Sequence, residues 1–202
     1  MSRARCAGAA FAVLALCAAV PAVGAEPIAK RAEACFACHG KNGHSQTPLT
    51  PSLGGQPSFF TVAQLFLFRD NRRGKVPTPM YEIAKGMSDD DLRAFGDFIA
   101  KLPPPPPPGP VADAARFARG RAIAQQHHCG SCHNPDFSGR DQMPRLANQR
   151  EDYLLKALRD YKSGARVGYG RGMSETLTPL GDADLADVAY FLAWLPAPQK
   201  AR

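Results

Sequence analysis

Apolar residues recur at helical spacing along much of the chain, and no segment shows the strict alternation of a half-buried strand. The clearest case follows Ser88, which suits a helix N-cap and has an acidic residue, Asp91, three positions later. Apolar residues then recur every three or four positions until Pro103 ends the pattern. They are Leu92, Phe95, Phe98, Ile99 and Leu102. The pattern predicts an amphipathic helix between Ser88 and Pro103.

The same pattern returns near the C-terminus because the chain contains an internal repeat. A shift of 93 residues aligns the copies without a gap from Gln56 to Pro103. It places Gln56 on Gln149, Met80 on Met173, Leu92 on Leu185, Phe98 on Phe191, and Leu102-Pro103 on Leu195-Pro196. The second copy of the last helix is predicted from Gly181-Asp182 to Pro196, and each copy also predicts a middle helix, beginning near Pro57 in the first. The chain is therefore predicted to hold two similar all-α modules.

The two copies are joined by six consecutive prolines, Pro103 to Pro108, followed by Gly109 and Pro110. Such a run forms an extended, semi-rigid polyproline helix. A recognition motif for a proline-binding domain is the alternative, which the position at a module junction disfavours. The predicted organisation is a first module at 26–102, a linker at 103–110 and a second module at 111–202.

Residues 1–25 have the pattern of a cleaved secretory signal peptide. Arg3 and Arg5 provide a basic start, Ala7–Val20 is uncharged and apolar, and small residues end the segment at Ala25. The apolar run is shorter than the roughly 20 residues that a transmembrane helix needs. We therefore expect an exported, periplasmic protein. Association with the membrane surface stays open.

Removal of this segment would leave four cysteines, arranged as two close pairs that are each followed by histidine. The motifs are Cys35-Phe-Ala-Cys38-His39 and Cys129-Gly-Ser-Cys132-His133. C-x-x-C-H is the attachment pattern of haem c: the thiols form thioethers with the porphyrin, and the histidine binds iron. A zinc site would have to span both modules, and a thioredoxin-like pair would need a βαβ context. The motifs predict two covalent haem c groups, which would also complete two small cores.

The second ligand of each iron is expected from methionine, because Met80 and Met173 coincide in the repeat. Met87 falls opposite Leu180, and Met143 has no methionine counterpart. No second histidine repeats either, so His44, His127 and His128 are expected to be solvated surface groups. The predicted iron ligands are thus His39 with Met80 and His133 with Met173. This ligation raises the reduction potential relative to two histidines.

These residues resemble the cytochrome c4 family, whose members are two-domain, dihaem class I cytochromes c. The resemblance covers nearly all of the chain after residue 25. Besides the haem motifs it rests on Pro51-Ser-Leu-Gly-Gly-Gln56 and Pro144-Arg-Leu-Ala-Asn-Gln149, and on the next helices with Arg73 and Arg166. It implies that Met80 and Met173 are axial ligands and that the carbonyls of Pro51 and Pro144 accept the histidine Nδ1–H. It also implies periplasmic electron transfer, often to a membrane haem–copper oxidase.

These residues suggest three functions. The first is an electron carrier between respiratory donors and a terminal acceptor, which is not an enzyme. The second is the electron-accepting subunit of a dehydrogenase complex, which differs only in its partner. The third is a dihaem peroxidase, which needs an open position on one iron and is disfavoured because both modules offer a methionine. The formal charge of +7 falls to +5 without Arg3 and Arg5, and haem propionates reduce it further. We expect redox-protein partners, no nucleic acid and no small-molecule substrate.

Overall fold

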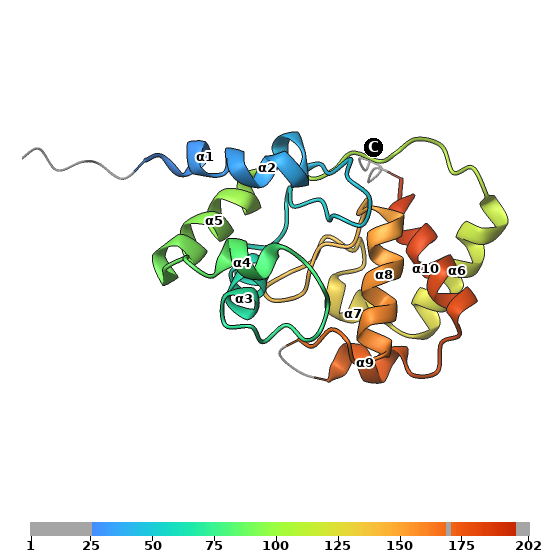
Figure 1. The fold of residues 1–202 in the computed structure, drawn as a ribbon. Helices are drawn as coiled ribbons and strands as arrows, with labels where there is room; N and C mark the ends of the chain where they lie inside the picture. The colour runs from blue at the N-terminus through green and yellow to red at the C-terminus, as the bar shows by residue number, and fades with distance from the viewer. Residues whose placement is uncertain (1–25, 169–170, 197–202) are drawn as a thin grey trace, which may run out of the picture.

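The computed structural model describes residues 26–168 and 171–196, so the predicted signal peptide at 1–25 lies outside the described residues. Its helices form two groups that lie side by side (Figure 1). The first helical group consists of α1 (Ile28–Arg31), α2 (Glu33–His39), the 3₁₀ turn η1 (Lys41–Gly43), α3 (Ser58–Arg69), α4 (Met80–Ala84) and α5 (Asp89–Lys101), with their loops. The second consists of α6 (Ala114–Gln126), α7 (Cys129–His133), α8 (Glu151–Lys162), α9 (Gly172–Leu177) and α10 (Asp182–Ala193). No strand occurs in the described ranges, which confirms the predicted all-α class.

The predicted helix after Ser88 is α5, and its N-terminus has the expected capping geometry. The Ser88 hydroxyl accepts a hydrogen bond from the Asp91 backbone N–H at 3.1 Å, and an Asp91 carboxylate oxygen accepts from the Ser88 N–H at 2.9 Å. Its apolar face packs on α3 around Leu92 and Phe95. The predicted middle helices are α3 and α8, and the predicted last helix of the second copy is α10.

The second helical group is built on a close crossing of α6 and α10. Gly120 faces α10 there, and a Cβ at this position would overlap the Asp187 carbonyl oxygen and lie 2.7 Å from the Phe191 Cβ. The core around the crossing includes the fully buried Leu185 and Leu192. The absence of a side chain at position 120 therefore sets the distance between these helices.

The proline segment runs along one side of the molecule between α5 and α6 (Figure 1). Its start is held by the first helical group: His44 Nε2 lies 2.8 Å from the Pro103 carbonyl oxygen. A Cβ on Gly54 would overlap that same oxygen. His44 is thus a half-buried surface group, and its ring also contacts the start of the linker.

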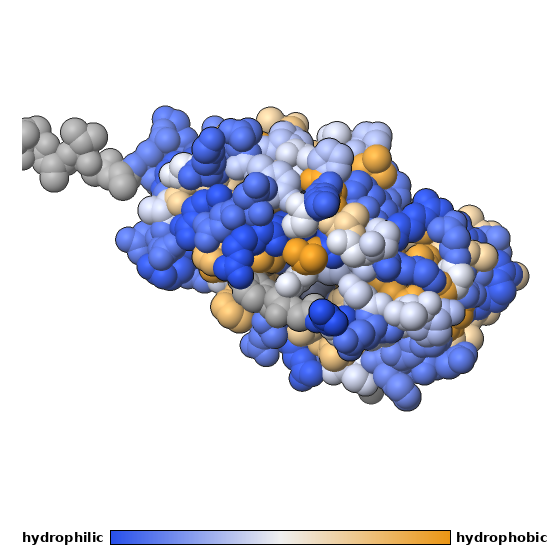
Figure 2. Space-filling model, turned by 60° about the horizontal axis from the view of Figure 1, so that its bottom comes forward, coloured by the Kyte–Doolittle hydropathy of each residue, from blue (hydrophilic) through white to orange (hydrophobic). Residues whose placement is uncertain are grey.

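The described part of the chain contains no helix with the length and apolar character needed to cross a membrane. The face shown in Figure 2 is mostly hydrophilic, with apolar side chains in small separate groups. The large apolar residues that remain exposed are Leu49, Phe59, Ile83 and Val167.

Candidate haem-binding sites

Each C-x-x-C-H motif lies on a short helix, α2 or α7, that ends with its histidine. In both motifs the first cysteine is half-buried and the second is exposed: Cys35 and Cys129 against Cys38 and Cys132. Burial raises the pKa of the Cys35 and Cys129 thiols. No disulfide joins any two of these four cysteines. In each motif one thiol thus packs against a core and the other lies at the surface.

The two histidines are buried and are held in the same way. His39 Nδ1 lies 2.8 Å from the Pro51 carbonyl oxygen, and His133 Nδ1 lies 3.0 Å from that of Pro144. These contacts confirm what the family resemblance implied for the two prolines. Because a carbonyl can only accept, Nδ1 carries the proton and Nε2 keeps its lone pair.

Burial favours the neutral form of both imidazoles, since it lowers the pKa of His39 and His133 by more than the proline contacts raise it. His133 Nε2 is buried and has no hydrogen-bond partner among the described residues. A buried polar atom without a partner is costly. A neutral nitrogen with a free lone pair is the form of histidine that binds haem iron. The residues present therefore fit a covalently attached haem.

The two methionines predicted as ligands occupy equivalent places. Met80 is the first residue of α4 and packs against the first core, as Cys35 does. Met173 lies in the first turn of α9 and packs against the second core, as Cys129 does. Each therefore shares an apolar cluster with the first cysteine of its own motif. Met87 also packs on the first core, whereas Leu180 occupies the equivalent position in the second.

A polar cluster between the helical groups was not predicted from the sequence. It is centred on Tyr153 of α8, whose hydroxyl lies 3.2 Å from Arg166 Nη1 and 3.5 Å from Arg73 Nη2. Gln64 Oε1 accepts from Arg73 Nε at 2.9 Å and from Arg166 Nη2 at 3.1 Å. Both arginines are buried. The repeat gave no sign of this cluster, because Phe60 is the counterpart of Tyr153.

Ionisation of the Tyr153 hydroxyl is expected to make the free energy of unfolding depend on pH in the alkaline range. Burial of the hydroxyl raises this pKa, but the charges of Arg166 and Arg73 outweigh burial and lower it to about 8. An unfolded tyrosine has a pKa near 10, so the native state loses this proton first and gains stability as pH rises from about 8 to about 10. The gain is fully present above pH 10, is lost as pH falls through 8, and amounts to roughly 2–3 kcal/mol.

The measurement is the free energy of unfolding of the holoprotein at pH 7 and pH 10, beside that of Tyr153→Phe. The difference between the two proteins should widen toward pH 10, because every other titrating group is common to both. A difference that does not change with pH would contradict the lowered pKa.

Comparison with known proteins gives matches that extend over most of the chain. The family model for cytochrome c matches residues 117–196. Cytochrome c4 of Thiocapsa roseopersicina is 30% identical over 192 residues, which cover 88% of this chain and 96% of that protein. The solved cytochrome c4 of Acidithiobacillus ferrooxidans matches with a TM-score of 0.73 and 28% identity, covering 81% of this chain and 99% of that one. A shorter match, 36% identical over 69 residues, covers 34% of this chain and 32% of a Stutzerimonas stutzeri protein named thiosulfate dehydrogenase electron acceptor.

Proposed function

Because this chain belongs to the cytochrome c4 family, whose members are dihaem electron carriers, we propose that it carries single electrons in the periplasm between respiratory donors and a terminal acceptor such as a haem–copper oxidase. Two haem c groups are covalently attached, one for each C-x-x-C-H motif. When bound, each supplies an iron that alternates between the ferric and ferrous states. The chain determines which ligands and which surroundings that iron has.

The proposed haem contacts follow from the equivalence of the two helical groups. Cys35 and Cys38 would hold one haem, with His39 and Met80 on its iron. Cys129 and Cys132 would hold the other, with His133 and Met173 on its iron. The observation that carries this proposal is that each motif has a buried histidine held by a proline carbonyl and a methionine in the same apolar cluster as its first cysteine. The two units would correspond to domains at 26–102 and 111–202.

Such an arrangement suits electron transfer because it changes little during the reaction. The carbonyls of Pro51 and Pro144 fix the histidine rings, and the apolar clusters keep water from the ligands. Two protein ligands in both oxidation states leave no position for a substrate. The exposed Cys38 and Cys132 would place one edge of each haem near the surface, where a redox partner can approach.

The oxidase assignment predicts that respiratory membranes from the producing cell reoxidise the reduced protein under air. Cyanide, which blocks haem–copper oxidases, should stop this reaction. Reduced protein that stays reduced in the presence of active membranes would contradict the assignment.

A second candidate is the electron-accepting partner of a dehydrogenase, which the match to the Stutzerimonas stutzeri protein favours. This candidate is tested by reduction of the protein rather than by its reoxidation. The oxidised protein should be reduced when thiosulfate and a thiosulfate dehydrogenase are added together. Neither addition alone should reduce it.

Maturation is expected to remove residues 1–25 and to attach two haems. Periplasmic expression with haem-attachment machinery should yield an intact mass equal to residues 26–202 plus two haems, since both motifs are complete. Cys132→Ala tests the assignment, because this variant can form only one of the two thioethers of the second haem. Attachment of that haem should become less complete, while attachment of the first haem should not change. A wild-type mass with a single haem, or with the first 25 residues retained, would contradict this prediction.

A further inference from the structure

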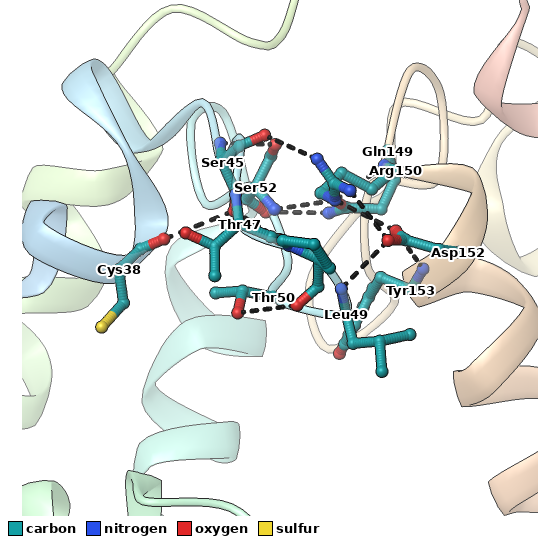
Figure 3. A network of polar contacts seen from close by, with 11 residues as sticks. Cys38, Ser45, Thr47, Leu49, Thr50, Ser52, Gln149, Arg150, Asp152 and Tyr153 are labelled. Atoms are coloured by element: carbon teal, nitrogen blue, oxygen red, sulfur yellow. Dashed lines mark hydrogen bonds and ion pairs between the residues drawn. The ribbon is translucent and has the colours of Figure 1, made fainter.

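The two P-x-L-x-x-Q segments bind one another across the interface through a reciprocal set of hydrogen bonds. Gln149 Oε1 accepts from the Ser52 backbone N–H at 2.7 Å, and Gln149 Nε2 donates to the Ser52 carbonyl at 2.8 Å (Figure 3). In the opposite direction, Gln56 Oε1 accepts from the Arg145 N–H at 3.0 Å, and Gln56 Nε2 donates to the Arg145 carbonyl at 2.9 Å. Gln56 and Gln149 are equivalent in the repeat, as are Ser52 and Arg145. A glutamine side chain of each helical group therefore forms two hydrogen bonds with the main chain of the other group.

One of the two peptide groups that each glutamine contacts also forms a hydrogen bond with a histidine. The peptide bond between Pro51 and Ser52 accepts from His39 Nδ1 through its carbonyl and donates to Gln149 through its N–H. A single peptide unit thus joins the histidine of the first helical group to a side chain of the second.

The second helical group repeats this connection. The peptide bond between Pro144 and Arg145 accepts from His133 Nδ1 and donates to Gln56. In both cases, the peptide that accepts from a histidine of one helical group therefore donates to a glutamine of the other group. One such contact could be incidental, but the second occurs at the equivalent residues of a repeat.

Hydrogen bonds in series through one peptide reinforce one another, and more so where water is absent. Ser52, Gln56 and Gln149 are only 4%, 6% and 5% exposed. When the peptide N–H donates, its carbonyl becomes a stronger acceptor for the histidine Nδ1–H. A stronger acceptor makes the imidazole more basic and therefore a better donor to a metal. A more basic ligand favours ferric over ferrous iron and so lowers the reduction potential.

We propose that each glutamine is a positioning residue for the haem of the other helical group: Gln149 lowers the reduction potential of the haem at His39, and Gln56 lowers that of the haem at His133. This rests on the proposed function, because it requires His39 and His133 to bind the irons. The alternative is that the glutamines only satisfy buried peptide groups. Their loss would then loosen the interface and affect both haems alike.

The test uses the full-length holoprotein and measures the two potentials separately. Haem methyl resonances in proton NMR spectra, assigned with Met80→Ala and Met173→Ala, follow each haem through a redox titration. Gln149→Leu should raise the potential of the haem at His39 by more than it changes that of the haem at His133. Gln56→Leu should show the reverse preference.

Asn148→Gly is the matched control. Asn148 precedes Gln149 and donates to the Leu195 carbonyl at 2.7 Å, within its own helical group. Glycine suits its positive φ of 59°. This variant should leave the potential of the haem at His39 unchanged. Equal shifts at both haems in Gln149→Leu, or a shift confined to the haem at His133, would overturn the proposal.

A second pair of variants covers the case in which a leucine variant does not accumulate. Gln149→Glu and Gln56→Glu keep an oxygen at the same reach and make it a stronger acceptor. Each should lower the potential of the opposite haem more than that of its own, and the reverse order would overturn the proposal. Failure of the proposed function would appear in the wild-type titration itself, as spectra without low-spin, histidine- and methionine-ligated iron in both haems.

Discussion

Replacing Met80 by alanine is expected to remove methionine from one iron only and to leave the other haem unchanged. The oxidised variant should lose about half of the methionine-to-iron charge-transfer absorption, and the potential of the affected haem should fall, because a thioether ligand raises it. Met173→Ala should have the same effect on the other haem. The reason is that Met80 and Met173 occupy equivalent positions, each packed against the same core as the first cysteine of one motif.

Met87 and Met143 provide the matched controls. Met87 packs on the same core as Met80, but Leu180 replaces it in the second helical group. Alanine at either control position should leave the charge-transfer absorption at its wild-type level. Loss of this absorption in Met87→Ala, together with its retention in Met80→Ala, would show that the repeat identifies the wrong ligand.

A loss of stability is expected from Gly120→Ala at the crossing of α6 and α10. The new Cβ would overlap the Asp187 carbonyl oxygen, which is backbone and cannot rotate away. Separating the helices would loosen the core around Leu185 and Leu192. Overpacking of this kind costs about 1–3 kcal/mol and outweighs the roughly 1 kcal/mol by which alanine favours a helix over glycine.

The measurement is the midpoint of thermal unfolding of the holoprotein, with Gly86→Ala as the control. Gly86 is exposed, and a Cβ there would contact nothing within 4 Å. The midpoint should fall in Gly120→Ala and stay near the wild-type value in Gly86→Ala. An unchanged midpoint in Gly120→Ala would mean that the helices separate at little cost.

Much of the helical framework was predictable because its signals are local. Ser88 and Asp91 form the predicted cap, and Pro103 follows the end of α5 as expected. The helices α4 and α9 were not predicted, although Met80 and Met173 lie in their first turns, because elements of 5 and 6 residues are too short to show a helical period. The class and the family were confirmed, since they rest on motifs and on a repeat rather than on single positions.

The interface was not predictable from the sequence. Gln56 and Gln149 were recognised as equivalent residues of a family motif, but equivalence in a repeat does not say that two copies touch. Their contacts depend on the orientation of the helical groups, as does the insertion of Tyr153 between Arg73 and Arg166. Orientation is set by many weak contacts between distant residues, and no local pattern records it.

The central claim is that both irons are six-coordinate and serve electron transfer alone. Its most direct test is carbon monoxide binding to the freshly purified, fully reduced holoprotein at neutral pH, followed by optical spectroscopy. Two protein ligands on each iron leave no vacant position, so both haems should remain low-spin and carbon monoxide should bind negligibly. Stoichiometric carbon monoxide binding at one haem would contradict the claim and place a dihaem peroxidase ahead of an electron carrier.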